Sequence, residues 1–269
     1  MKFDMHCHTM EGSLDSKVKI EDYIRSLKKQ GFGGMLVTDH NSYNGYRAYS
    51  DTVKGKKFKD FVVLRGIEYD TFDAGHIIVV LPETEHLLLM ELRGLPLHLL
   101  MDIVHRHGGI LGPAHPYGEA YLSFMNTKKR KKKKELLSCF DFIEIFNSCQ
   151  PAHVNKKALS LSRALKKPGF GGSDAHKPDC VGMGYTELPD SIRTESDLIA
   201  YVRQTDEIKC GGQFYRKTTK DKIGKWNNIL VFSFFFYNKF CAFIRRHKRT
   251  IETRNIIISK NARFHKDKQ

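Results

Sequence analysis

The stretch MKFDMHCHT at residues 1–9 places two histidines at the end of a short strand-like segment. Residues 1–7 are predicted to form a β-strand, and His6 and His8 stand two positions apart at its carboxyl end. Side chains two residues apart on an extended chain point to the same side. Both imidazoles can therefore reach one ion, and imidazole nitrogen is a common ligand of zinc.

Short β-rich runs alternate with amphipathic helical stretches from this strand to about residue 210. Further strands are predicted at residues 34–38, 61–67, 76–81, 110–114, 142–146 and 170–172. Helices are predicted at residues 16–30, 97–107, 152–165 and 195–204. This alternation with short connections predicts an α/β fold with a mainly parallel sheet or barrel.

Histidines and carboxylates border nearly every one of these strands. Beyond the first strand they are Asp39, His40, Glu68, His76, His115, Glu144, Asp174 and His176. Apart from His76 and Glu144, each stands where a strand passes into the following loop. The carboxyl ends of strands in a parallel barrel converge on one face, where the active sites of such barrels form. One such histidine would ordinarily be structural, but the joint placement predicts a shared metal site.

A family resemblance follows from the order of these motifs. They are HxH (6–8), TDH (38–40), GxE (66–68), GH (75–76), AHP (114–116), ExxN (144–147) and GSDAH (172–176). The series resembles the polymerase-and-histidinol-phosphatase (PHP) superfamily of metal-dependent phosphoesterases, over residues 1 to about 210. The resemblance implies a distorted seven-stranded β/α barrel that holds two to three divalent ions, which would be zinc, manganese or iron.

The resemblance also implies that nine side chains hold three ions, with Glu68 bridging the first two. In the order of the ions they are His6, His8, Glu68 and Asp174; Glu68, His76 and His115; and Asp15, His40 and His176. A metal-activated hydroxide would attack phosphorus, and His176 or the third ion would help the leaving oxygen take a proton. Glu68, Asp174 and His176 are thus the implied catalytic residues.

Three carboxylates have more than one interpretation. Asp15 either binds metal or caps the helix expected from residue 16. Members that resemble histidinol phosphatase often have a histidine near this place, so Asp15 is closer to the branch that acts on nucleotides and short RNA or DNA 5′ ends. Glu144 contacts metal, orients a ligating histidine from behind, or is a core acid. Asp39 is expected to orient a neighbouring imidazole.

The net charge of +15 is concentrated in two segments. Residues 213–269 contain 15 Lys and Arg against 3 Asp and Glu, and residues 128–134 (KKRKKKK) are all basic. The 128–134 run is either a solvated loop or an attractor of polyanionic substrate near the active face. Arg47, Arg65 and Lys177 are weaker candidates for phosphate ligands.

Composition divides the chain after residue 212. The resemblance implies a PHP-type phosphoesterase domain at residues 1–212, and residues 213–269 form a basic, aromatic C-terminal extension. The most apolar stretch in the chain, residues 229–244 (ILVFSFFFYNKFCAFI), lies in this extension. It is short for a bilayer span. A helix packed on the barrel, a membrane-surface helix with the basic flank 245–249, and a true span are the three interpretations.

Together these features predict an enzyme that hydrolyses a phosphomonoester, a nucleotide or an oligonucleotide 5′ end. Its partners would be a phosphorylated small molecule or nucleotide, with an oligonucleotide and a peripheral membrane contact as further candidates. A metal-dependent amidohydrolase on a similar barrel and a non-catalytic nucleic-acid-binding module are the alternatives. The six cysteines form no CxxC pair and the opening residues lack a secretory pattern, so a cytoplasmic protein is expected.

Overall fold

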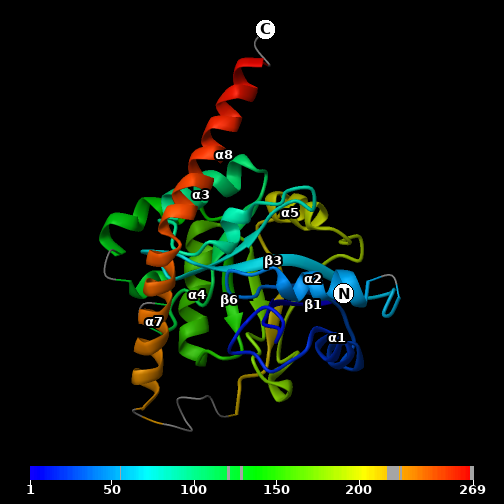
Figure 1. The fold of residues 1–269 in the computed structure, drawn as a ribbon. Helices are drawn as coiled ribbons and strands as arrows, with labels where there is room; N and C mark the ends of the chain where they lie inside the picture. Colours follow the sequence, from blue (N-terminus) through cyan, green and yellow to red (C-terminus); the bar gives the residue numbers. More distant parts are fainter. Residues whose placement is uncertain (55, 120–121, 128–129, 217–223, 225, 267–269) are drawn as a thin grey trace.

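The computed structural model describes every residue except 55, 120–121, 128–129, 217–223, 225 and 267–269 (Figure 1). One mixed sheet has the strand order β5-β4-β3-β2-β1-β8-β9. Its strands are β1 (Lys2–Cys7), β2 (Phe32–Val37), β3 (Val62–Asp70), β4 (His76–Val80), β5 (Ile110–Pro113), β8 (Gly184–Glu187) and β9 (Cys210–Gly212). The strands β6 (Ile143–Asn147) and β7 (Gly169–Gly172) pair with each other.

The pair β6–β7 fills the gap between the two sides of the curled sheet. The backbone N–H of Asp174, just after β7, donates to the carbonyl of His6 on β1 at 2.9 Å. The N–H of Asp141, just before β6, donates to the carbonyl of Leu111 on β5 at 2.9 Å. Strands β1 to β7 therefore form the expected distorted seven-stranded β/α barrel, while β8 pairs with the amino end of β1 on one side and with β9 on the other.

The expectation of a mainly parallel sheet is only partly right. Strand β2 is parallel to both β1 and β3, and β6 is parallel to β7. Strand β4, however, is antiparallel to β3 and to β5, because only a short turn joins β3 to β4. In this hairpin His76, the first residue of β4, lies opposite Asp70, the last residue of β3. His76, at the beginning of β4, therefore lies at the same end of the barrel as the residues at the carboxyl ends of the neighbouring strands.

The helices of the barrel pack outside its strands (Figure 1). They are α1 (Ile20–Lys29), α2 (Asn44–Thr52), α3 (Leu97–Arg106), α4 (Ala152–Leu165) and α5 (Glu195–Gln204), with short 3-10 helices η1 (Leu88–Glu91), η2 (Phe124–Asn126), η3 (Arg130–Cys139) and η4 (Pro178–Cys180). Helix α1 begins four residues later than predicted. The preceding segment is held on the barrel instead, where Lys17 N donates to His176 O at 3.0 Å and Ser16 Oγ donates to His8 O at 2.8 Å.

Strand β1 is buried on both faces, and the two faces differ in chemistry. Phe3 and Met5 belong to an apolar cluster that also contains the stacked rings of Phe142 and Phe170, whose centroids are 4.0 Å apart. Asp4, His6 and His8 are also fully buried, but Asp4 faces outward, where its carboxylate accepts a hydrogen bond from the Tyr23 hydroxyl on α1 at 3.2 Å. The register of β1 shifts between Asp4 and Cys7. Fully burying an apolar side chain is worth about 1.5–3 kcal/mol, so the apolar cluster holds the strand, and with it His6 and His8 at its carboxyl end, in place.

The C-terminal extension forms two long helices along one side of the barrel (Figure 1). They are α7 (Trp226–Ile244) and α8 (Arg246–Lys266). By length and composition alone, helix α7 is long and apolar enough to cross a membrane. Only 6% of its most apolar stretch is buried in the structure. Residues 128–129 of the basic run lie outside the described residues, and residues 130–134 begin η3.

Candidate metal centre

Four side chains from three parts of the barrel surround one point at the carboxyl end of β1. The Nε2 atoms of His6 and His8 lie 3.0 Å apart. One oxygen of Asp174 lies 3.6 Å from His6 Nε2 and 3.3 Å from His8 Nε2. The carboxylate of Glu68 approaches the same two nitrogens at 3.5 and 3.4 Å. The structure thus brings together all four residues of the first implied ion site.

Glu68 stands at the centre of the cluster, at only 1% exposure. Its Oε1 lies 3.0 Å from His76 Nδ1 and 3.1 Å from His115 Nε2. Its Oε2 lies 3.1 Å from His40 Nδ1. The two oxygens of one carboxylate therefore face different histidines, which is the arrangement that a bridging ligand requires.

The third implied group lies at the outer edge of the cluster. The carboxylate of Asp15 is 3.2 Å from His176 Nε2 and 3.7 Å from His40 Nε2. The ring of His176 stacks on that of His8 with centroids 4.2 Å apart. The interpretation of Asp15 as a helix cap is wrong, because α1 begins at Ile20 and its N-cap residue is Lys19.

Asp70 is a further acidic member of the cluster that the motif pattern did not single out. Its Oδ1 lies 3.2 Å from His76 Nε2 and 3.6 Å from His40 Nδ1. Its Oδ2 accepts a hydrogen bond from Asn41 Nδ2 at 2.6 Å. The signal was present in the sequence, because Asp70 follows Glu68 by two positions on β3 and so shares its face, as His8 follows His6 on β1.

The donor set fits divalent ions. Among the described residues, three buried side-chain atoms at the cluster form no hydrogen bond, namely His40 Nδ1, Asp70 Oδ1 and His76 Nε2. His6 must donate its Nδ1 proton to the carboxylate of Glu144, at 2.8 Å, so its neutral ring presents a lone pair at Nε2. Lone pairs of nitrogen and oxygen that meet in a buried site are stabilised by a bound cation, and this ligand set suits zinc, manganese or iron.

Opposite charges inside the cluster shift the pKa values of its members. Burial alone would raise the pKa of Glu68, but the surrounding histidines, His76 first, hold it well below its usual range. Burial lowers the pKa of His40, but the nearby carboxylates of Glu68, Asp70 and Asp15 together outweigh it, and the pKa rises to about 10. Burial and the neighbouring His176 lower the pKa of His8 to about 3. In the metal-free protein near pH 7 some of these histidines are therefore protonated and others are not.

Binding of divalent metal to the metal-free protein at pH 7.5 is expected to release about one or more protons, because ligating imidazoles must be neutral. His40, with its pKa near 10, carries a proton at this pH that a metal ion would displace. Since the pKa is raised, lowering the pH should weaken metal binding by roughly tenfold per unit for each proton displaced. Titration calorimetry in buffers of different ionisation enthalpy measures the release. A buffer-independent heat would contradict it.

Glu144 orients His6 from behind the cluster. Its Oε1 accepts from His6 Nδ1, and its Oε2 accepts from the backbone N–H of His115 and, at 3.2 Å, from Asn147 Nδ2. Asn147 also donates to Asp174 Oδ2 at 3.0 Å. With both oxygens engaged in this way, the geometry favours the orienting role over direct metal contact.

Substituting Glu144 with Gln is expected to weaken metal binding by about 10–100-fold while the fold is retained, because the His6 ring loses its charged partner. The metal dissociation constant can be measured by competition with a chromophoric chelator. Glu187→Gln is the matched control, since Glu187 is exposed on β8. Equal affinities for the two variants would show that Glu144 does not orient the ligand.

Asp39 acts on the histidines through Ser13. Its carboxylate accepts from the N–H and hydroxyl of Thr9, at 2.6 and 2.7 Å, and from the hydroxyl of Ser13 at 2.9 Å. Ser13 Oγ lies 3.3 Å from His8 Nδ1 and accepts from the backbone N–H of His40 at 3.1 Å. Asp39 therefore holds Ser13, and Ser13 in turn contacts the His8 ring and the backbone of His40.

Two cluster residues have strained backbone conformations. His115 has φ of 30° and Asp174 has φ of 53°, a region that residues other than glycine rarely occupy. Each is held there by a hydrogen bond from its backbone N–H, to Glu144 and to the carbonyl of His6 respectively. Such strain costs about 1–3 kcal/mol per residue and persists where the surrounding structure imposes it.

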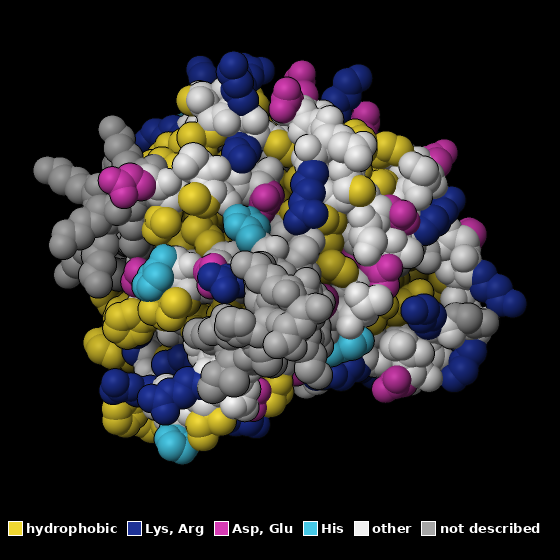
Figure 2. All heavy atoms as spheres, turned by 90° about the horizontal axis from the view of Figure 1, so that it is seen from above, with side chains coloured by type: hydrophobic (Ala, Val, Ile, Leu, Met, Phe, Trp, Pro, Cys, Tyr) yellow, Lys and Arg dark blue, Asp and Glu magenta, His cyan; other side chains and the backbone are white. Residues whose placement is uncertain are grey.

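Two of the weaker phosphate-ligand candidates, Arg47 and Arg65, have other partners. Arg47 pairs with Glu91 at 2.6 Å, and the guanidinium of Arg65 donates to the carbonyls of Pro82 and Glu85. Arg93, which the sequence did not single out, lies nearer: its guanidinium is 3.4 Å from Asp70 Oδ2. Arg93, Asp15 and His40 line one small cavity of about 260 Å³. On the face shown in Figure 2, basic side chains are scattered both at the outline and within the face.

Comparisons with solved structures show the same fold. The structure is similar to PsfC from Pseudomonas syringae, with 19% identity, a TM-score of 0.60, and coverage of 87% of this chain and 98% of that one. It is similar to an amidohydrolase from Chromobacterium violaceum, with 13% identity, a TM-score of 0.55, and coverage of 74% and 96%. A two-domain Bacteroides vulgatus protein containing a predicted PHP-like metal-dependent phosphoesterase matches with 15% identity, a TM-score of 0.52, and coverage of 79% and 65%.

Sequence comparisons give the family. A search of curated proteins finds no match to this sequence. A family model described as PHP-associated matches residues 152–206. The model of the PHP domain matches residues 4–172, which is more than half of the chain and includes the HxH, GxE and AHP motifs. The protein therefore belongs to the PHP domain family.

Proposed function

We propose that this protein hydrolyses phosphate esters at the cluster centred on Glu68. Family membership and the clustered histidines and carboxylates support a metal-dependent hydrolase. The observation that carries the proposal is the convergence of two nitrogen-and-oxygen groups on Glu68, with His6 and His8 on one side and His76 and His115 on the other. Two ions that share a carboxylate are the arrangement that in-line displacement at phosphorus uses.

Each residue of the proposed site has a part in the reaction. Two to three divalent ions, held as the resemblance implies, would neutralise phosphoryl oxygens and lower the pKa of a water. Glu68 fixes the spacing of the two inner groups, and Asp174 would complete the first of them beside His6 and His8. His176 is the most exposed histidine of the cluster, at 27% of its side chain, so it is positioned to give a proton to the leaving oxygen.

Hydrolysis of a C–N bond is the second candidate, and the structural similarity to an amidohydrolase favours it. A panel of phosphomonoesters, mononucleotides, 5′-phosphorylated oligonucleotides and amides, each with and without chelator, separates the two. We expect chelator-sensitive release of inorganic phosphate from at least one ester and no cleavage of the amides. Amide cleavage without phosphate release would replace this proposal by the second candidate.

A further inference from the structure

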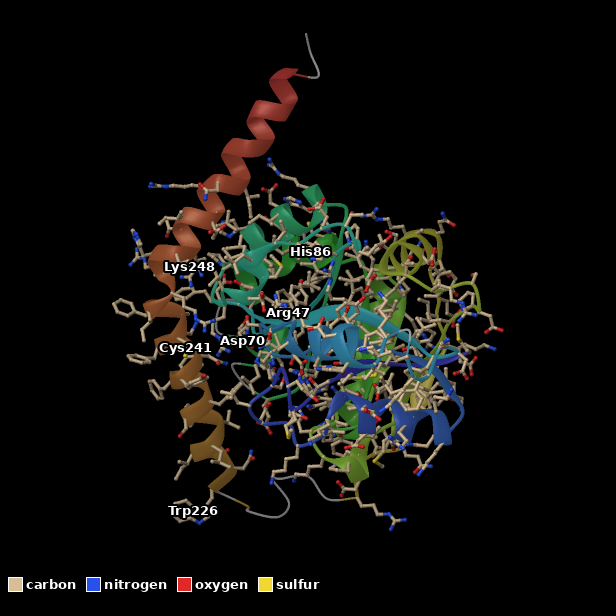
Figure 3. The ribbon with its side chains drawn as sticks, turned by 45° about the vertical axis from the view of Figure 1, so that its right-hand side comes forward. Arg47, Asp70, His86, Trp226, Cys241 and Lys248 are labelled. Carbon is tan, nitrogen blue, oxygen red and sulfur yellow. The ribbon has the colours of Figure 1, made fainter. Side chains whose placement is uncertain are left out.

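An apolar cavity of about 530 Å³ lies beside the metal cluster, between helix α7 and the β3–β4 hairpin. At its inner end are Asp70 and His76, which are members of the cluster. Its walls are largely aromatic and aliphatic: Phe72, Leu122, Phe232, Phe235, Phe236 and Ala242. Figure 3 shows α7 running past Asp70, with Trp226 at the far end of the helix. Cavities of roughly 300–1,000 Å³ with apolar walls and a few polar groups are typical of small-molecule sites.

Helix α7 is fixed in this position by polar contacts with the barrel. Asn238 accepts a hydrogen bond from Arg93, and Lys239 donates to the backbone carbonyl of Phe72. Ala242 is 6% exposed, and a Cβ added at Gly94 would approach its Cβ within 2.7 Å. At the start of α8, Arg249 donates to the carbonyl of Arg93 at 2.7 Å. The wall of the cavity is therefore attached to the same residues that border the metal cluster.

The aromatic side chains of α7 reach the histidines themselves. The ring of Phe234 lies 5.6 Å from that of His40 and 6.3 Å from that of His76, centroid to centroid. Because Asp70 and His76 line the cavity of about 530 Å³, a phosphoryl group at the cluster would lie at one end of it. This cavity is larger than the one of about 260 Å³ that borders His40 and Phe234.

We propose that this cavity receives the organic part of the substrate, which is the phosphomonoester of an apolar alkyl or aryl alcohol. The inference rests on the proposed function and adds the class of the leaving group. In the reaction water adds to phosphorus, the P–O bond to the alcohol breaks, and the departing oxygen takes a proton, giving inorganic phosphate and the free alcohol. The aromatic walls stabilise an apolar group by burying its surface.

Polar organic groups fit this cavity less well. Hydroxyl groups of a sugar or glycerol would lose hydrogen bonds with water against Phe232, Phe235 and Leu122, and such desolvation is costly. The ammonium of Lys239 is directed over the ring of Phe72, 4.1 Å from its centroid. These contacts favour apolar surface along most of the cavity.

Hexyl phosphate and glycerol 1-phosphate test the inference. They form a matched pair because the leaving group of each is a primary alkoxide. With the metal-loaded full chain we expect kcat/KM for hexyl phosphate to exceed that for glycerol phosphate by at least about tenfold. Phe235→Ser, in the half-buried wall, should lower kcat/KM for hexyl phosphate by about tenfold and lower kcat/KM for glycerol phosphate by much less. Phe243→Ser on the same helix is the control, since Phe243 is 71% exposed and outside the cavity.

The outcomes separate this inference from the proposed function. Retained glycerol phosphate turnover in Phe235→Ser shows that the metal centre has survived the substitution. A preference for glycerol phosphate or a mononucleotide, or equal effects of Phe235→Ser and Phe243→Ser, would overturn the inference while phosphate release upholds the proposed function. No chelator-sensitive release from any ester would overturn the proposed function and this inference with it.

Discussion

Glu68→Gln is expected to lower kcat for phosphate ester hydrolysis by about a thousandfold, the equivalent of several kcal/mol of lost transition-state stabilisation. Glu68 is 1% exposed, and its two oxygens face His76, His115 and His40. Gln keeps the shape but replaces one oxygen by an amide nitrogen, which cannot bind a cation. The bridge between the two inner groups is then lost, and the second ion with it.

Glu91→Gln is the control for this substitution. Glu91 is a glutamate near the mouth of the site whose carboxylate pairs with Arg47 rather than with a histidine. Steady-state kinetics and metal content should be measured on both variants at equal purity, with circular dichroism to show that the fold is retained. A Glu68→Gln variant with wild-type kcat would mean that the chemistry does not occur at this cluster.

Removing the divalent ions is expected to lower the melting temperature by roughly 5–10 °C. An ion present at a hundred times its dissociation constant stabilises the native state by about 2.7 kcal/mol, and each kcal/mol is worth about 2–4 °C for a chain of this size. The site is built from buried groups, which are the carboxylates of Glu68, Asp70 and Asp174 and the histidines around them. The unfolded chain cannot hold these groups together, so the ions bind the native state alone.

Differential scanning fluorimetry with and without chelator measures this difference. The matched control is Asp174→Ala, which removes the carboxylate that lies within 3.6 Å of both His6 and His8. Chelation should change the melting temperature of this variant much less than that of the wild-type protein. Equal melting temperatures for the wild type with and without chelator would show that ions do not contribute to its stability.

The barrel and most of the cluster could be predicted from the sequence, because both depend on short-range patterns. Residues two apart on one strand share a face, so the HxH motif places His6 and His8 together, and the structure does so. Strand ends marked by His40, His115 and Asp174 converge when the strands are neighbours. These relations need only the identity and order of the strands.

Three other features were not predicted, and only the first of them depends on long-range packing. The start of α1 at Ile20 reflects hydrogen bonds between residues 16–17 and the His8 and His176 loops. The antiparallel course of β4 depends on the tight turn after Asp70, and the prediction of a mainly parallel sheet missed it. Asp70 itself was missed because the family motifs, rather than the strand face, guided the choice of ligands.

The position of the C-terminal extension is the feature that the sequence left most open and that the structure defines. Composition indicated an apolar helix with a basic flank but left its location open among the barrel, a membrane surface and a span. In the structure α7 lies against the barrel, with Phe234 close to His40 and His76. Its sequence offers no pattern that pairs it with these loops, because the contacts join residues more than a hundred positions apart.

Metal reconstitution followed by phosphate release tests the central claim most directly. The purified protein is stripped with chelator, titrated with manganese, zinc or iron, and assayed on the phosphate ester panel, with bound metal measured by elemental analysis. We expect no activity in the stripped protein and activity that rises until two to three equivalents of metal are bound. A protein that binds none of these metals, or that stays inactive on every ester when fully loaded, would contradict the claim.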